Sequence, residues 1–328
     1  MKMSLTTTLP SSNKKRSKHL QHSQSTKDKM KALSELGFSS SEIAKLVLGS
    51  ETKKSSVNRV LASDGKVGKA PKPEEKKGLK ILFVPDCQVR KGVDTTYLTA
   101  IGQYIVDKKP DVVVNIGDFF DMPSLSVYDK GKLSFEGRRL AEDIEAGKEG
   151  MKKFLQPLRD YQEINPSYQP RMVFCLGNHE ERLQRVPSNN SEFEGFIGYH
   201  LLELEKDWEV YDFLKPVNIQ GINFVHYLSH PMTGKPYGGN AASMLKNVGC
   251  SFCVGHKQTL EVAIQPVLDG TMRLGIVAGA SYLFDEPYKD AGFGNSHFRG
   301  VVMLHDAKDG FADPSFISTK FLIERLNT

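Results

Sequence analysis

Five short apolar runs in this 328-residue chain each end abruptly in a group of polar residues. The runs are residues 80–85, 112–116, 172–176, 222–225 and 251–254. Runs of this length, rich in Val, Ile and Phe, are typical of buried strands. Apolar residues at helical spacing fill residues 97–108 and 140–160, between the first and the third run. This alternation predicts a layered α/β domain that begins at residue 79.

Two further apolar runs, residues 274–278 and 301–304, come later with closer spacing and more turns. Strands that are not separated by helices favour antiparallel pairing, so this part predicts a mixed sheet. We therefore expect residues 79–328 to form mixed β-sheets flanked by helices.

The polar motifs at the ends of the five runs carry metal-binding residue types. In chain order they are Asp86-Cys87-Gln88, Gly117-Asp118-Phe119-Phe120-Asp121, Gly177-Asn178-His179-Glu180, His226 and Gly255-His256-Lys257-Gln258. Loops at the carboxyl ends of strands form the ligand crevice of layered α/β folds, so we expect these loops to converge. Carboxylate, amide and imidazole groups suit Mn, Fe, Zn or Mg, so the sequence predicts a metal site.

Two metal ions about 3.5–4 Å apart can clamp the attacking and leaving oxygens of a phosphoryl displacement. Asp118 comes directly after a glycine and fits the carboxylate that must bridge the two ions. His179, next to the predicted ligand Asn178, could donate a proton to the leaving oxygen. Asp121 or Glu180 would orient the His179 imidazole. We predict that Asp118, Asn178 and His179 carry the chemistry.

The other histidines differ in how well they fit a ligand role. His226 is preferred to His230, because His226 ends an apolar run and His230 precedes a proline. His200 lies in a leucine-rich helical stretch, which favours a structural role. His297 lies in the glycine-rich segment GFGNSHFRG, which could border the cleft.

Taken in order, the five motifs resemble those of the calcineurin-like metallophosphoesterase superfamily over about residues 79–325. The pattern there is D-x-H, G-D-x-x-D, G-N-H-E/D, a single H, and G-H-x-H. The resemblance implies two metal sites that share Asp118. The first would be held by Asp86, Gln88, Asp118 and Gln258, and the second by Asp118, Asn178, His226 and His256.

The chain departs from this pattern at Gln88 and Gln258, which stand where the superfamily has the two histidines of the first site. Because both changes fall on one site, we interpret them as a change of metal preference. A site made only of oxygen ligands favours hard ions, which predicts two divalent cations, Mn²⁺ first and Mg²⁺ as the alternative. The other interpretation is that the first metal is lost or weakly bound.

The N-terminal part of the chain is strongly basic. Residues 1–80 contain 18 Lys and Arg against 7 Asp and Glu, whereas the remainder contains 26 against 32. A basic region of this kind predicts a polyanionic partner. Residues 1–26 are polar without periodicity and predict a disordered basic tail. Residues 63–78 are rich in Gly, Pro, Lys and Glu and predict a linker.

Residues 27–62 have three stretches of helical periodicity, and Ser39 stands three residues before Glu42 as in a capping box. This segment resembles the helix-turn-helix of resolvases and sigma-like DNA readers. The resemblance implies double-stranded DNA as a partner. The candidate DNA-binding residues are Lys53, Lys54, Ser55, Ser56, Asn58 and Arg59. The alternative is a small helical module that docks on another protein.

No run of about 18 apolar residues and no apolar signal-peptide core is present, so we expect no membrane span and a cytoplasmic protein. The layout resembles bacteriophage metallophosphoesterases, which implies the host cell cytoplasm for a viral protein. Four cysteines occur, and Cys250-x-x-Cys253 lacks a second pair at zinc-finger spacing, so we expect free thiols.

The residues directly after Gly117-Asp118 bear on the substrate class. The Ser/Thr phosphatases of the superfamily have an arginine there, whereas this chain has Phe119-Phe120-Asp121-Met122-Pro123, which resembles the recombination-repair nucleases. The sequence therefore predicts a metal-dependent DNA endonuclease that nicks as a monomer and cuts both strands as a dimer. The alternatives are a phosphomonoesterase or protein phosphatase with a partner-binding N-terminal domain, and a non-catalytic DNA-binding protein with a decayed phosphoesterase domain.

Overall fold

The computed structural model of the chain describes residues 22–62, 77–286, 295 and 297–326. It divides into two units, residues 1–76 and 77–328. Most of the predicted basic tail and of the predicted linker lies outside the described residues. The last three residues of the predicted tail are helical instead, because Ser23 caps a helix by accepting a hydrogen bond from the Thr26 backbone N–H at 3.2 Å.

The N-terminal unit contains three α-helices: α1 (Gln24–Glu35), α2 (Ser40–Leu48) and α3 (Lys54–Ala62). A short 3-10 turn, η1 (Glu51–Lys53), joins the last two. Side chains from all three helices form its core: Met30, Ile43, Ala44, Val57, Val60 and Leu61. The predicted capping box at Ser39 and Glu42 is present at the start of α2. The unit thus has its own small apolar core, and the exposed side of α3 carries polar and basic side chains.

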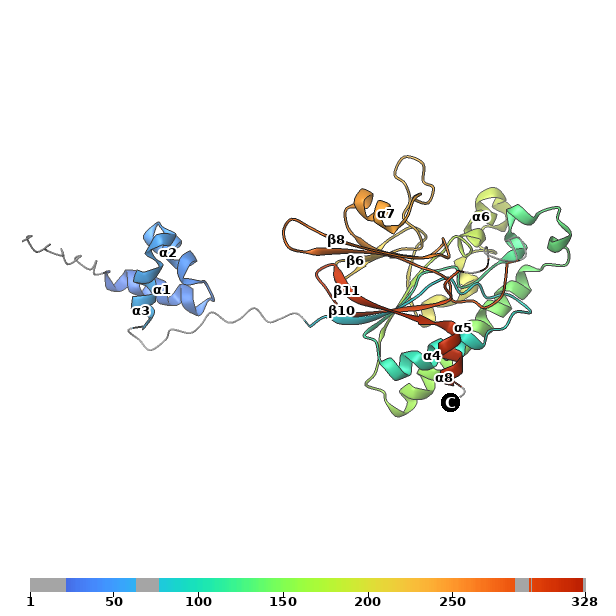
Figure 1. Cartoon of the computed structure of the whole chain (residues 1–328), viewed down its shortest axis with the longest axis horizontal. Helices are drawn as coiled ribbons and strands as arrows, with labels where there is room; N and C mark the ends of the chain where they lie inside the picture. Colours follow the sequence, from blue (N-terminus) through green and yellow to red (C-terminus); the bar gives the residue numbers. More distant parts are fainter. Residues whose placement is uncertain (1–21, 63–76, 287–294, 296, 327–328) are drawn as a thin grey trace, which may run out of the picture. The chain divides into compact units, whose positions relative to one another are not determined.

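The second unit begins with a six-stranded sheet (Figure 1). Four parallel strands form its centre and one side: β1 (Leu79–Val84), β2 (Val112–Asn115), β3 (Arg171–Cys175) and β4 (Glu209–Tyr211). Two antiparallel strands, β10 (Gly300–Lys308) and β11 (Phe311–Ser318), complete it on the other side of β1. The order across the sheet is β11-β10-β1-β2-β3-β4.

A five-stranded sheet faces the first one and has the order β5-β6-β7-β9-β8. The parallel strands β6 (Ile222–Phe224), β7 (Ser251–Val254) and β9 (Met272–Ala278) lie at its centre. The antiparallel strands β5 (Val217–Ile219) and β8 (Leu260–Pro266) form its edges. Aliphatic and aromatic residues of both sheets fill the space between them, including Phe83, whose ring lies 5.8 Å from that of Phe224.

Helices cover the outer faces of both sheets. The six-stranded sheet is covered by α4 (Thr96–Lys108), α5 (Leu140–Ile164) and α8 (Thr319–Leu326) (Figure 1). The five-stranded sheet is covered by α7 (Ala241–Val248), and α6 (Glu181–Asn189) comes after β3. Further short 3-10 turns in the described residues include η2 (Pro123–Leu125), η3 (Val127–Asp129), η4 (Leu133–Phe135), η5 (Ser191–Phe193), η6 (Tyr199–Leu202) and η7 (Leu204–Lys206). The four layers confirm the predicted α/β fold with mixed sheets and flanking helices.

Each of the seven predicted apolar runs is a strand, and both predicted helices are present, with α5 continuing to Ile164 past Pro157. The sequence does not predict the strands β4, β5, β8 and β11 or the helices α6, α7 and α8. All four of these strands are sheet edges, where one side lacks a neighbouring strand and the apolar run is short or interrupted. Within the described residues, no helix has the length and apolar character that crossing a bilayer requires.

Candidate metal centre

The motif loops converge because they all leave the carboxyl ends of the parallel strands β1, β2, β3, β6 and β7. Two of these loops touch through their glycines. Gly117 has φ +90°, and a Cβ atom there would lie 2.3 Å from the Gly177 backbone nitrogen. Only glycine allows such a backbone conformation and such a close approach, so these glycines bring Asp118 beside Asn178 and His179.

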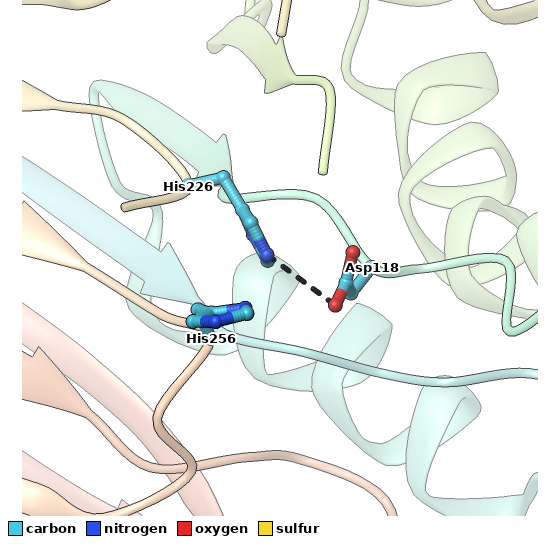
Figure 2. A group of neighbouring side chains, drawn as sticks. All are labelled: Asp118, His226 and His256. Atoms are coloured by element: carbon cyan, nitrogen blue, oxygen red, sulfur yellow. Dashed lines mark ion pairs between the residues drawn. The ribbon is translucent and has the colours of Figure 1, made fainter. Parts of the chain in front are cut away.

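Four of the predicted ligands meet around one point. The ligand atoms of Asp118, His226 and His256 all lie within 4.8 Å of one another (Figure 2). Asn178 Oδ1 accepts hydrogen bonds from His226 Nε2 at 2.9 Å and from His256 Nδ1 at 2.7 Å. The Asp118 Oδ2 atom lies 3.3 Å from His226 Nε2. These are the four residues expected for the second metal, and their donor atoms suit a transition-metal dication.

The His226 ring is held in a fixed orientation. Its Nδ1–H donates to the Ile116 carbonyl at 2.9 Å, which leaves Nε2 facing Asp118 and Asn178. Burial lowers the pKa of His226, but the Asp118 carboxylate outweighs it and raises the pKa to about 9. Burial and the neighbouring His226 lower the pKa of His256 to about 4. A cation at this point would take the place of the His226 Nε2 proton.

The first predicted site consists of oxygen donors that are buried and incompletely satisfied. Asp86 Oδ1 accepts from the His256 backbone N–H at 3.1 Å, whereas Asp86 Oδ2 has no hydrogen-bond partner within the described residues. Gln88 Oε1 is also buried without a hydrogen-bond partner within the described residues. Burial, together with the Asp118 carboxylate, raises the pKa of Asp86 to about 7. Buried acceptors without donors are costly, and a divalent cation would satisfy them, so the residues fit a metal.

Gln258 completes this set with its side chain held in place. The Tyr282 hydroxyl donates to Gln258 Oε1 at 3.0 Å. Both glutamines thus present amide oxygen within the buried centre, which is a harder ligand than imidazole nitrogen.

Four predicted ligands share an unusual backbone conformation. Each has a positive φ although none is glycine: Gln88 (46°), Asp118 (49°), His256 (66°) and Gln258 (60°). Non-glycine residues adopt this left-handed region rarely and at a cost in free energy, and such residues concentrate at functional sites. The loops are therefore held in conformations that serve the side chains they present.

His179 lies at the edge of this centre. Its Nδ1 atom is 3.0 Å from Asp121 Oδ1, and its Nε2 atom is 3.7 Å from Asp118 Oδ2. Burial lowers the pKa of His179, but the Asp118 and Asp121 carboxylates outweigh it and raise the pKa above its ordinary value of 6.5. The Asp121 carboxylate is itself paired with Arg90 Nη1 at 2.9 Å. These carboxylates therefore favour the protonated form of the imidazole.

Glu180 does not contact the His179 imidazole, so of the two candidates for that role Asp121 is the one in place. The buried Glu180 carboxylate accepts hydrogen bonds from four backbone N–H groups, those of Asp118, Phe119, Phe120 and Gly177, at 2.8–3.0 Å. It thus joins the loop after β2 to the loop after β3. Its effect on the metal centre is to fix the backbone that carries Asp118.

A family model for the calcineurin-like phosphoesterase domain matches residues 79–258, which contain all five motifs. The chain belongs to the calcineurin-like phosphoesterase family. The geometry described above agrees with a metal-dependent hydrolase of phosphoesters.

Two bacteriophage proteins are similar to part of this phosphoesterase. The Gene 54 proteins of Mycobacterium phage L5 and Mycobacterium phage D29 are 35% and 34% identical to it over 103 residues. Each match covers 31% of this chain and 36% of the relative. The chain thus spans about a third of the length of these relatives.

The remaining histidines of the phosphoesterase lie outside the centre. His230 lies in a loop where its ring packs against Tyr237, and His200 belongs to the turn η6. His297 packs against Tyr282 at a ring distance of 5.5 Å and is not among the residues that line the cavity into which the centre opens. Cys87, Cys175 and Cys253 are buried free thiols, and Cys250 is an exposed one.

Sequence reasoning missed three residues that shape the centre: Arg90, Arg182 and Tyr282. Arg90 and Arg182 follow motifs, and Tyr282 lies beyond the last of them. Each acts through a contact with a residue at least 24 positions away in the chain. Arg182, for example, donates from Nη1 to the carbonyls of Asp121 and Met122 at 2.9 and 3.0 Å. Its place three residues after His179 in the run HEER was the one available signal, because a tight turn brings such residues together, and the Arg182 N–H does donate to the His179 carbonyl at 3.2 Å.

The centre opens into a cavity of about 930 Å³. Its lining includes the predicted metal-binding residues Gln88, Asp118, Asn178, His256 and Gln258. Residues of the segment 123–139 form much of the remaining lining, and His179 and Arg182 also line the cavity. A substrate would therefore reach the metal-binding residues from this cavity.

Proposed function

We propose that this phosphoesterase is a metal-dependent DNA endonuclease that hydrolyses phosphodiester bonds and nicks one strand at a time. The observation that carries the proposal is the set of Asp118, Asn178, His226 and His256, of which Asp118 and His226 are buried, beside the His179 imidazole. Such a set combines ligands for a phosphate-polarising cation with a proton donor for the leaving oxygen.

Two divalent cations are proposed, with Mn²⁺ preferred and Mg²⁺ as the alternative. Asp86, Gln88, Asp118 and Gln258 would hold one, and Asp118, Asn178, His226 and His256 the other. When bound, such ions polarise phosphoryl oxygens and lower the pKa of coordinated water. The two glutamines support the choice of hard ions, because they replace nitrogen donors with oxygen donors.

The side chains of the phosphoesterase would then have distinct roles. Asp118, fixed by its backbone and by the His179 N–H that donates to Oδ1 at 2.9 Å, positions both halves of the centre. The Oδ1 atom of Asn178 faces His226 and His256, so its amide N–H groups would be left to bind a phosphate oxygen. His179 gives its Nε2 proton to the leaving oxygen, and Asp121 at Nδ1 stabilises the charged imidazole before transfer.

The N-terminal unit is proposed to bring the phosphoesterase to double-stranded DNA as a helix-turn-helix. The side chains of Lys54, Ser55, Asn58 and Arg59 lie on the exposed side of α3, opposite the buried Val57 and Val60. Lysine and arginine on such a face bind phosphates, and serine and asparagine can contact base edges.

The experiment incubates the purified chain with supercoiled plasmid in Mn²⁺, Mg²⁺ or Zn²⁺. The proposal expects open circles in Mn²⁺ or Mg²⁺ and none with Asp118→Ala. Asp160→Ala, which removes an exposed carboxylate on α5, is the matched control and should cut like the wild type. Hydrolysis of a phosphopeptide without any action on plasmid would favour the phosphatase alternative. DNA binding without metal binding would favour the non-catalytic one.

A further inference from the structure

The segment 123–139, which contains η2, η3 and η4 and leads into α5, lines the same cavity as the metal-binding residues. This segment contributes Tyr128, Lys132, Arg138 and Arg139 to the cavity. Over its whole length it has four Lys and Arg against two Asp and Glu. Three of its cationic side chains line the cavity beside Asp129 and Glu136 and share it with the metal-binding residues, which suits a ligand with several phosphates.

Two guanidinium groups on the cavity lining are held by backbone carbonyls. Arg182 donates from Nη1 to two backbone carbonyls, and Arg139 donates from Nη1 to the Arg138 carbonyl at 3.0 Å. Neither makes an ion pair within the part of the chain that the structure describes, whereas the neighbouring Arg138 pairs with Asp129 at 2.9 Å. A guanidinium held by carbonyls keeps its remaining N–H groups for phosphate oxygens.

Tyr128 adds an aromatic surface to this lining. Its side chain is 89% exposed, and yet it lines the cavity beside the basic residues. An aromatic ring exposed among cations in a phosphate-binding cavity is the arrangement on which unpaired bases stack in proteins that bind single strands.

We propose that Tyr128, Arg139 and Arg182 form a subsite for unpaired nucleotides that flank the phosphodiester being cut. Tyr128 would stack on a base, and the two arginines would bind the neighbouring phosphates. The inference rests on the proposed nuclease function and names the substrate class of that site. A cavity of about 930 Å³ has the size of a small-molecule site and can take a single nucleotide. The bases of an intact duplex are stacked inside the double helix and cannot enter such a cavity.

The test compares cleavage of a short single-stranded oligonucleotide with cleavage of the same sequence as a blunt duplex. It uses the full-length chain in Mn²⁺. Tyr128→Ala and Arg139→Ala should each raise KM for the single strand about tenfold, with a smaller change in kcat. Tyr128→Phe, which keeps the ring, should restore the wild-type KM. Binding of the labelled single strand in EDTA, measured by fluorescence anisotropy, should weaken by the same factor.

Two exposed residues of the same segment provide matched controls. Val127 and Lys130 do not line the cavity, so Val127→Ala and Lys130→Ala should leave KM and the EDTA affinity at wild-type values. The subsite is refuted if Tyr128→Ala and Arg139→Ala behave like these controls, or if KM rises equally for duplex and single strand.

A separate substrate distinguishes failure of the subsite from failure of the nuclease function. If the wild type hydrolyses bis(p-nitrophenyl) phosphate but cuts neither oligonucleotide, the nuclease function is overturned and the subsite with it. If both oligonucleotides are cut and the variants match their controls, only the subsite is overturned.

Discussion

His179 and Asp121 are held with Nδ1 of the imidazole 3.0 Å from Oδ1 of the carboxylate, and the second Asp121 oxygen lies 2.9 Å from Arg90 Nη1. The pair links the loop after β2 to the loop after β3. Burial lowers the pKa of His179, but Asp118 and then Asp121 outweigh it and raise the pKa, so Asp121 helps to favour the charged form of an imidazole that lines the cavity.

Replacing Asp121 with Asn should therefore slow the reaction by lowering the pKa of His179. General acid catalysis contributes about 10²–10⁴-fold, so a loss of about 10²-fold is expected for an oligonucleotide with its poor leaving group. A p-nitrophenyl leaving group needs little protonation and should be affected much less. As the pH rises, the rate of the variant should begin to fall at a lower pH than the rate of the wild type. Equal losses on both substrates would contradict the role of this pair.

Replacing Glu180 with Gln should destabilise the fold. The carboxylate accepts four backbone N–H groups in a fully buried position, and an amide would bring its own donors against them. Leaving a buried donor unsatisfied costs about 1–3 kcal/mol, so the free energy of unfolding should fall by about 3 kcal/mol. Urea denaturation of the metal-free protein measures it. Glu163→Gln on the exposed side of α5 is the control, and a similar small change in both variants would refute the prediction.

Replacing Gln88 and Gln258 together with His should change the metal preference of the phosphoesterase. Imidazole nitrogen suits Zn²⁺ better than amide oxygen does, so Zn²⁺ should bind the double variant more tightly relative to Mn²⁺ than it binds the wild type. Calorimetric titration with each ion gives the two affinities. An unchanged ratio would mean that these glutamines do not contact metal.

Metal-free protein should lose stability as the pH rises from about 6.5 to 9. Burial lowers the pKa of His226 but Asp118 outweighs it and raises the pKa to about 9, so the folded protein holds this proton above the ordinary pKa of 6.5. The stabilising contribution is therefore complete below pH 6.5 and is lost as the pH passes 9. Burial raises the pKa of Asp86 from 3.8 to about 7, so ionisation of its carboxyl group disfavours the folded state increasingly up to about pH 7 and by a constant amount above it.

Thermal unfolding between pH 6 and pH 9, with EDTA or with Mn²⁺, tests this dependence. Mn²⁺ should raise the melting temperature more at pH 9 than at pH 6, because cation and protons compete for the same atoms. A metal-free melting temperature that rises over this range in the wild type, with the same slope in Asp86→Asn, would contradict the assignment.

Replacing Lys54 with Ala should weaken binding of duplex DNA in the absence of divalent metal. If this exposed side chain contacts a phosphate, the slope of log affinity against log salt should become shallower by about one unit. Lys29→Ala on α1 is the matched control, because it removes an exposed lysine from another helix. Identical salt slopes for both variants and the wild type would argue for the protein-docking alternative.

The ligands could be predicted from the sequence because each one lies just after a buried strand. A short run of Val, Ile and Phe is enough to predict a buried strand, and a polar residue at its carboxyl end predicts a position in the ligand crevice. Asp118, His226 and His256 are predictable in this way, and they lie within 4.8 Å of one another. The loops that carry these side chains are short, so the local sequence was sufficient to predict where the ligands lie.

Other relationships depend on contacts between residues far apart in the chain, which no local window records. The sequence offers Glu180 as a residue that orients His179, but the fold brings its carboxylate to the backbone of residues 118–120, about sixty positions earlier. The edge strands β4, β5, β8 and β11 escape prediction because their partners, and not their own periodicity, make them strands. The cationic side chains of residues 123–139 likewise meet the metal-binding residues only because the fold brings this segment to a cavity that the loops after β1, β2, β3 and β7 also line.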